Sequence, residues 1–230
     1  MSKAVSRKAW NAFAGLALCT SLGLAGCGSS DDNVNYVEQP VEVLYNRALD
    51  ELGAQEYKAA AKGFEEVDRQ HPYSVWATKA QIMAAFAYYQ SNKYDEAVIA
   101  LDRFIQLHPG HRDIPYAYYL KALCYYEQIS DVGRDQRMTQ QALEALAEVV
   151  KRFPESPYAR DSRLKVELAI DHLAGKEMTV GRFYQQAQQY VGAINRYRVV
   201  IERYQTTTHV PEALHRLVEC YLSLGVKSEA

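Results

Sequence analysis

The sequence is organised around an alanine that recurs five times among the same apolar neighbours. These alanines are Ala60, Ala97, Ala142, Ala193 and Ala230. Large apolar residues follow four positions later at Phe64, Leu101, Leu146 and Tyr197, and seven positions later at Val67, Phe104, Val149 and Val200. Offsets of three, four and seven residues place side chains on one face of a helix. The pattern therefore predicts one amphipathic helix per unit.

A second pattern marks where these helices end and what precedes them. Twelve residues after the alanine stand Pro72, Pro109 and Pro154, with Gln205 at that position in the fourth unit. Proline pushes the preceding residue out of the helical region, so the helix stops there. Upstream of each alanine, small and apolar residues at helical spacing predict a partner helix. They include Tyr45, Ala48, Leu52, Ala84, Ala85, Tyr88, Tyr118, Ala122, Tyr125, Leu214, Leu217, Val218 and Tyr221.

Repeated helix pairs with small residues at the crossing points resemble the tetratricopeptide repeat, whose period is 34 residues. Here the alanines are 37, 45, 51 and 37 residues apart, so each unit carries extra residues. One insertion is polar, over 128–139. A longer one, over 158–174, predicts a helix of its own with Leu164, Leu168 and Leu173 as its apolar stripe. We predict an all-α tetratricopeptide-repeat solenoid of about five helix pairs.

The fifth unit is incomplete in this sequence. Ala230 is both the last residue and the central alanine of that unit, so the second helix is absent. A first helix over 212–224 would then leave an apolar stripe uncovered. Either more chain or another protein covers it, and the sequence leaves both open.

The N-terminus has the layout of an export signal. Three basic residues lie within the first eight positions, and an apolar run follows over 9–25. Residues 24–27, Leu-Ala-Gly-Cys, resemble the bacterial lipobox. The resemblance implies cleavage before Cys27, a diacylglycerol on its thiol and an acyl chain on the new amino terminus. The alternative is an ordinary signal peptide with an incidental cysteine. Several acyl chains are enough for stable anchoring.

These features divide the chain into four parts. Residues 1–26 are the signal peptide, and 27–40 are a polar, lipidated, flexible tether. Residues 41–126 hold the N-terminal repeats with a peptide groove. Residues 127–230 hold the C-terminal repeats, which we expect to bind a scaffold partner. No Asp follows Cys27, which by resemblance to sorted lipoproteins implies the periplasmic face of the outer membrane.

The composition points to recognition rather than chemistry. Loss of residues 1–26 takes the formal net charge from −2 to −5, which argues against nucleic acid as a partner. There is no glycine-rich phosphate loop and no Gly-x-Ser-x-Gly nucleophile. His108, His111 and Asp113 lie close together, but Pro109 and Gly110 mark an ordinary turn there. We expect no enzyme, no metal and no cofactor beyond the acyl chains on the lipidated cysteine.

Two cysteines remain within the repeats, at Cys124 and Cys220. Both fall at the same place in their predicted first helices, two units apart. That separation is too great for a disulfide, so we predict two buried thiols.

Aromatic residues concentrate on the first helices of units two and three. The predicted groove residues are Tyr73, Trp76, Ile82, Phe86, Tyr89, Tyr119, Leu123 and Tyr126. One interpretation is that these rings pack neighbouring helices. The other is a groove for an extended peptide with an aromatic end, since exposed apolar patches mark interaction sites.

Several short stretches resemble one family in particular. They are His-Pro-Tyr-Ser at 71–74, Leu-Asp-Arg-Phe-Ile at 101–105, Arg-Asp-Gln at 134–136, Gly-Lys-Glu-Met at 175–178 and Val-Gly-Arg at 180–182. They are similar to the BamD (ComL) family of outer-membrane lipoproteins, which takes part in assembling β-barrel proteins. The resemblance covers essentially the whole chain after residue 26.

The resemblance implies partners as well as a fold. The C-terminal repeats would bind the periplasmic domains of the barrel-assembly protein, alongside other assembly lipoproteins, and the N-terminal repeats would engage unfolded precursors. Arg196, next to Asn195, matches the family's basic position for that contact, although a solvated arginine is the alternative. Arg134 and Asp135 are further candidates. The alternative function is a periplasmic scaffold for cell-wall synthesis or division enzymes.

Overall fold

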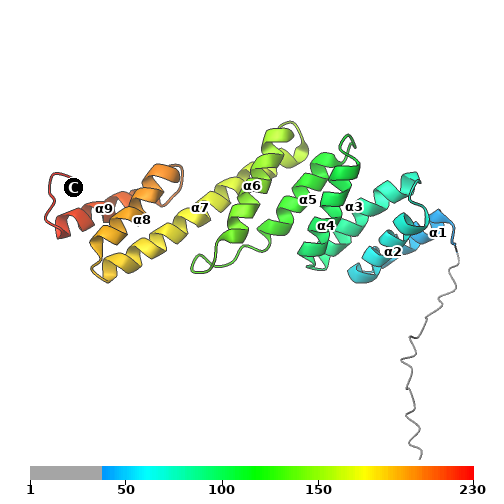
Figure 1. Ribbon diagram of the computed structural model, residues 1–230, viewed down its shortest axis with the longest axis horizontal. Helices are drawn as coiled ribbons and strands as arrows, with labels where there is room; N and C mark the ends of the chain where they lie inside the picture. The colour runs from blue at the N-terminus through cyan, green and yellow to red at the C-terminus, as the bar shows by residue number, and fades with distance from the viewer. Residues whose placement is uncertain (1–37) are drawn as a thin grey trace, which may run out of the picture. The chain divides into compact units, whose positions relative to one another are not determined.

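The computed structural model describes residues 38–230, and within this range it contains nine helices and no strand. They are α1 (Val41–Gly53), α2 (Tyr57–Gln70), α3 (Val75–Gln90), α4 (Tyr94–Leu107), α5 (Ile114–Tyr126), α6 (Arg137–Arg152), α7 (Pro157–Gln186), α8 (Tyr190–Arg203) and α9 (Val210–Ser223). Each helix packs against the next along the chain (Figure 1). The signal peptide, Cys27 and the tether as far as residue 37 lie outside the described residues.

The repeat pattern is confirmed as the core of the solenoid. Ala60, Ala97, Ala142 and Ala193 are fully buried, and so are the residues four and seven positions after each of them. These side chains lie on α2, α4, α6 and α8, which are the second helices of their pairs. The apolar face of each second helix therefore carries the packing within and between repeats.

The ends of the second helices are also confirmed. All four end ten residues after their alanine, whether or not a proline follows. The next residue turns out of the helix and donates its backbone N–H to the carbonyl of the buried residue four positions earlier. These cap residues are His71, His108, Phe153 and Tyr204. Because Gln205 gives the same ending as the prolines, a proline is not required to stop the helix.

The tight turn between paired helices recurs at one position. Four residues have positive φ, and each lies five residues before a repeat alanine. They are Gln55 (63°), Asn92 (58°), Gln188 (58°) and Gly225 (78°). The turn after α9 therefore has the same left-handed residue as the turns that precede α2, α4 and α8. The third unit replaces this turn with the insertion at 127–136.

The long helix α7 differs from the prediction. We expected a separate helix over 158–174, but α7 continues without a break into the first helix of unit four. The lone Gly175 does not interrupt it, as isolated glycines are tolerated within helices. Leu164 and Leu168 are more than half exposed, so they do not form a buried stripe, whereas Leu173 is buried. The buried face uses small residues instead, including Ala159, Ser162 and Ala169.

Two glycines allow close helix approach. A Cβ on Gly181 of α7 would lie 2.5 Å from a ring carbon of Tyr197, the fully buried residue of α8. A Cβ on Gly63 of α2 would lie 2.9 Å from the Cβ of Ala48. Both contacts are shorter than van der Waals packing permits, so these helix pairs depend on glycine.

The two remaining cysteines are free and buried, as predicted. Burial raises the pKa of the Cys124 thiol to about 12, so it stays protonated at neutral pH. None of the helices in residues 38–230 is both long and apolar enough to cross a bilayer.

Candidate binding surfaces

An aromatic surface runs along the first helices α3, α5 and α7, which contact one another in order. The ring of Tyr119 stacks on Tyr158 with centroids 5.1 Å apart, and its hydroxyl donates to Asp161 at 2.6 Å. Tyr116 packs on the same Tyr158 ring at 5.5 Å. Burial raises the pKa of Tyr116 to about 12. These rings hold α5 to α7 and leave partly exposed faces.

The neighbouring part of this surface is formed by Tyr89 and Tyr126. The hydroxyl of Tyr89 donates to Glu127 at 3.3 Å, and its ring lies 5.9 Å from Tyr94. Burial, followed by the charge of Glu127, raises the pKa of Tyr89 to about 12. The ammonium of Lys165 lies 5.4 Å from the centre of the Tyr126 ring. Both tyrosines are half-buried. Each ring therefore packs on neighbouring residues and also leaves part of its surface exposed.

The predicted groove residues do not all belong to this surface. The prediction is wrong for Ile82, which is only 7% exposed and lies in the apolar core of repeats two and three. Trp76, at the start of α3, packs on Tyr45 of the first repeat, with ring centres 4.9 Å apart. Tyr73 is fully exposed in the turn before α3. Phe86 and Leu123 are half-buried on α3 and α5.

Next to Tyr126 lies a wide pocket of about 590 Å³ that the sequence did not reveal. It forms where the insertion at 127–136 and the start of α9 meet the middle of α7. The insertion is tied to α7 by a hydrogen bond between His172 Nε2 and the Ser130 carbonyl (2.8 Å), and Lys176 donates to the Gly133 carbonyl at 3.0 Å. These contacts join residues more than 40 positions apart, so no local sequence pattern predicts them.

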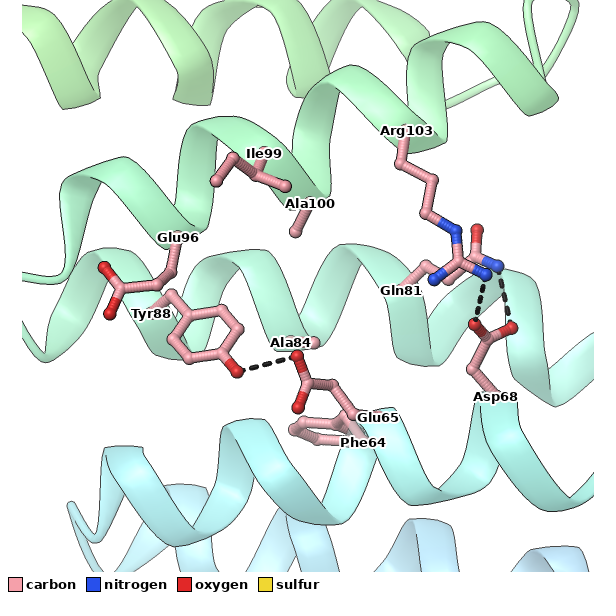
Figure 2. Close-up of a pocket in the computed structure, with 10 residues that line it drawn as sticks. All are labelled: Phe64, Glu65, Asp68, Gln81, Ala84, Tyr88, Glu96, Ile99, Ala100 and Arg103. Carbon is pink, nitrogen blue, oxygen red and sulfur yellow. Dashed lines mark hydrogen bonds and ion pairs between the residues drawn. The ribbon is translucent and has the colours of Figure 1, made fainter.

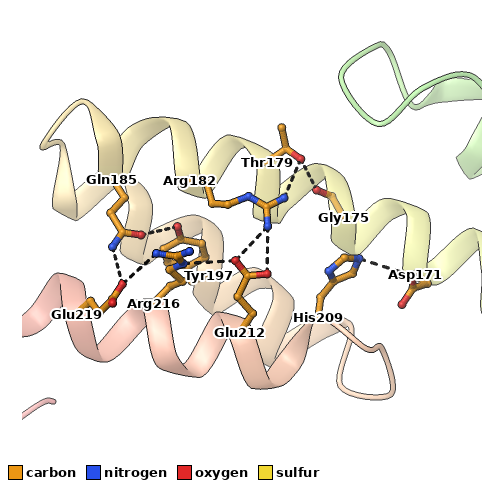
Figure 3. A network of polar contacts seen from close by, with 10 residues as sticks. All are labelled: Asp171, Gly175, Thr179, Arg182, Gln185, Tyr197, His209, Glu212, Arg216 and Glu219. Atoms are coloured by element: carbon orange, nitrogen blue, oxygen red, sulfur yellow. Dashed lines mark hydrogen bonds and ion pairs between the residues drawn. The ribbon is translucent and has the colours of Figure 1, made fainter.

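The C-terminal repeats carry a polar network beside their shared apolar core (Figure 3). Arg182 of α7 donates to both carboxylate oxygens of Glu212 on α9, each at 3.1 Å. Arg216 and Gln185 extend the network to Glu219. Burial alone would raise the pKa of Glu212, but hydrogen bonds and the positive charges of the two arginines lower it.

The predicted partner-binding residues lie at the surface. Arg196 is 44% exposed, and its guanidinium pairs with Glu177 of α7 at 3.1 Å. Asn195 is exposed beside it, and Arg134 and Asp135 are exposed in the insertion. The guanidinium of Arg196 thus pairs with one carboxylate of its own chain. Its remaining N–H groups can donate to a second carboxylate.

The histidines of the second turn serve packing. The rings of His108 and His111 lie 5.2 Å and 5.5 Å from Phe104. Within residues 38–230, no group of three or more His, Cys, Asp or Glu side chains is arranged to hold a metal ion.

Stacked helix pairs with exposed rings and ion pairs define a repeat scaffold of the protein-binding class. The profile of the outer membrane lipoprotein family, YfiO, matches residues 37–230, and the chain belongs to this family. The resemblance seen in the sequence is therefore confirmed.

Curated relatives agree with this assignment. The chain is 49% identical to the outer membrane protein assembly factor BamD of Caulobacter vibrioides, covering 93% of this chain and 71% of the relative. It is 46% identical to that of Rickettsia prowazekii (93% and 84% covered) and 36% identical to that of Neisseria meningitidis serogroup A (90% and 84%). Among solved structures, the TPR2AB domain of yeast Sti1 aligns at 12% identity and a TM-score of 0.46, covering 80% of this chain and 70% of that one.

Proposed function

We propose that this protein is a lipid-anchored scaffold on the periplasmic face of the outer membrane that assists assembly of β-barrel proteins. The family match over residues 37–230, with relatives named as outer membrane protein assembly factors, carries the proposal. The repeat fold supports it, because stacked helix pairs offer long surfaces to other proteins. The role is binding, with no chemical step.

Affinity purification of the tagged lipoprotein from mildly solubilised membranes tests this role. The expected result is stoichiometric recovery of an outer-membrane barrel protein with periplasmic domains, together with other lipoproteins. Recovery of cell-wall synthases or division proteins instead would contradict the proposal and favour the alternative scaffold.

The proposed anchor is the acylated Cys27. Replacement of Cys27 by alanine removes the acceptor thiol, so the protein should leave the membrane fraction and lose incorporation of labelled palmitate. A Cys124→Ala variant is the matched control, since that thiol is buried within the solenoid. Unchanged membrane association of the Cys27 variant would mean that another contact holds the protein.

For unfolded precursors, the proposed contact surface is formed by Tyr89, Tyr119, Leu123 and Tyr126. A peptide that ends in an aromatic residue can place its ring against these half-buried rings. Tyr89→Ala and Tyr126→Ala should each weaken binding of such a peptide, measured by fluorescence anisotropy, with unchanged helical circular dichroism. Tyr190→Ala on α8 provides a control at a half-buried tyrosine outside this surface. Loss of helicity would identify the two tyrosines as core residues.

The barrel-assembly protein is proposed to bind the C-terminal repeats at Asn195 and Arg196, with Arg134 and Asp135 as further contacts. Arg196→Glu places a negative charge opposite an acidic partner and beside Glu177, so co-purification of the assembly protein should fail. Arg198→Glu is the control, because Arg198 is also exposed on α8. Equal loss of the complex in both variants would indicate a general charge effect, and an unchanged complex would remove Arg196 from the site.

A further inference from the structure

Two grooves of similar size recur at equivalent places in successive repeats. The first groove lies between α2, α3 and α4 and has a volume of about 220 Å³ (Figure 2). The second groove lies between α5 and α6 and has a volume of about 230 Å³. Residues of α3 correspond to those of α5 at a spacing of 37, and residues of α4 correspond to those of α6 at a spacing of 45. The two grooves can therefore be compared position by position.

In the second groove, the lysine is paired with a carboxylate of the preceding helix. Lys121 on α5 reaches Asp102 on α4, with the ammonium 2.6 Å from a carboxylate oxygen. Glu144 on α6 adds a further carboxylate to the lining. The second groove is therefore lined by charged residues, and its lysine is already paired.

The first groove has apolar residues at the corresponding places. Ala84 stands where Lys121 stands, and Ile99 stands where Glu144 stands. Ile99 is 70% exposed, although it lines the groove, and the neighbouring Ala100 adds to the same apolar wall. The chain thus exposes a branched apolar side chain at a position that is charged one repeat later.

Among the described residues, the first groove contains an ion pair between Arg103 and Asp68 at 3.2 Å, but its other carboxylate on α2, Glu65, lacks a cationic partner. Glu65 is the equivalent of Asp102, but no ammonium stands beside it because Ala84 is too short. The carboxylate accepts a hydrogen bond from the Tyr88 hydroxyl at 2.7 Å, as Figure 2 shows, and makes no ion pair within the described part of the chain. A cation supplied from outside would fit this carboxylate as Lys121 fits Asp102.

We propose that the first groove is a docking site for a partner protein segment that inserts a large apolar side chain next to a lysine or arginine. The apolar side chain would pack against the exposed Ile99 and the neighbouring Ala100, and the cation would pair with Glu65. The volume lies below the range of about 300–1,000 Å³ typical of small-molecule sites. It suits a single anchoring side chain of a protein partner. This inference goes beyond the proposed function and does not depend on it.

The second groove supplies the variant that tests the proposal. Ala84→Lys with Ile99→Glu copies the charged lining of the second groove into the first. The new lysine would find Glu65 in the place of Asp102, and because Ala84 is only 3% exposed, helical circular dichroism checks that this variant folds. Ile99→Glu alone is a second variant, which cannot disturb the core because Ile99 is exposed. Glu144→Ala in the second groove is the matched control.

The probe is a phage-displayed library of 12-residue peptides, selected on the full-length lipoprotein in detergent. Selected peptides should share a large apolar residue beside Lys or Arg. As synthetic peptides they should bind both first-groove variants at least tenfold more weakly, and bind Glu144→Ala as they bind the natural protein. Failure to select any peptide with this pairing, or equal affinity of such peptides for the natural protein and Ile99→Glu, would overturn the proposal.

Discussion

The middle of the solenoid (α5 and α7) and its C-terminal end (α7 and α9) join their first helices with different side chains. Between α5 and α7 the contact is aromatic, with Tyr116 and Tyr119 packed on Tyr158. Between α7 and α9 an ionic contact, Arg182 with Glu212, is added to the shared apolar core. The second helices meanwhile keep the same buried positions throughout. The second helices therefore specify the repeat, which leaves the first helices free to differ and to acquire binding roles.

Aromatic and ionic contacts also differ in how much they stabilise the fold. Tyrosine rings bury large apolar areas, and aromatic pairs add about 0.5–1.5 kcal/mol beyond that burial. Partly exposed ion pairs contribute about 0–1 kcal/mol each. We therefore expect the core contact between Gly181 and Tyr197, within the fourth repeat, to contribute more stability than the polar network between α7 and α9.

The largest effect is expected from Gly181→Ala. The added methyl would lie 2.5 Å from the ring of Tyr197, which is fully buried and cannot move away. Overpacking of this kind costs about 1–3 kcal/mol and occasionally more. The free energy of unfolding, measured by urea denaturation, should fall by about 3 kcal/mol, at the upper end of that range.

A second substitution separates the clash from other effects of Gly181→Ala. Leucine fills the position of Tyr197 in units two and three, so Tyr197→Leu should recover part of the lost stability in the double variant. Gly53→Ala is the control, because a Cβ there meets nothing within 4 Å. Equal destabilisation by Gly53→Ala would mean that backbone effects of glycine, not the clash, dominate.

Acid should loosen the ionic contact of α9 before it loosens α3, whereas the aromatic contact between α5 and α7 also contains a carboxylate with a lowered pKa, Asp161. The folded-state pKa of Glu212 is lowered by its arginine partners, so its contribution to stability is present above the unfolded pKa of about 4.3. It is lost as the pH falls through the lowered value. Hydrogen exchange followed down to pH 3 should show α9 losing protection before α3. Parallel loss in both helices would contradict this order.

A double-mutant cycle measures the ionic contact directly. Arg182→Met and Glu212→Gln remove the charges while keeping similar side-chain size. Their coupling energy should be at most about 1 kcal/mol and should decrease in high salt. The matched aromatic cycle, Tyr119→Phe with Asp161→Asn, tests a 2.6 Å hydrogen bond in the other half. Coupling well above 1 kcal/mol for the arginine pair would make the network the main connection.

Much of the fold could be predicted because the repeat fixes which residues are buried. The positions around each alanine define both the core and the helix ends, independently of distant contacts. The continuous α7 could not be predicted in this way. A stripe of leucines was expected to be buried, but small residues such as Ala159 and Ala169 allow the closer helix approach that the packing uses.

Binding surfaces were less predictable, for physical reasons. The pocket beside Tyr126 needs His172 and Ser130 to meet, and only the three-dimensional fold brings them together. Ile82 resembled its aromatic neighbours in spacing, yet packing between repeats buries it. The exchange of Lys121 for Ala84 between the two grooves is visible in the sequence once the repeats are aligned. Its meaning depends on seeing that both residues line a groove.

The smallest effect is expected at the turns. Gln188, in the turn before α8, and Asn92, in the turn before α4, both have φ of 58°. This conformation costs most residues about 1–2 kcal/mol. Asparagine tolerates it better than glutamine. Glycine relieves this strain but loses more entropy on folding, so Gln188→Gly should stabilise by about 0.5 kcal/mol and Asn92→Gly by less. Gly225 already occupies the equivalent position after α9. If urea denaturation gave equal gains in the free energy of unfolding for both variants, the identity of the side chain would not matter at these turns. The two turns would then carry the same strain.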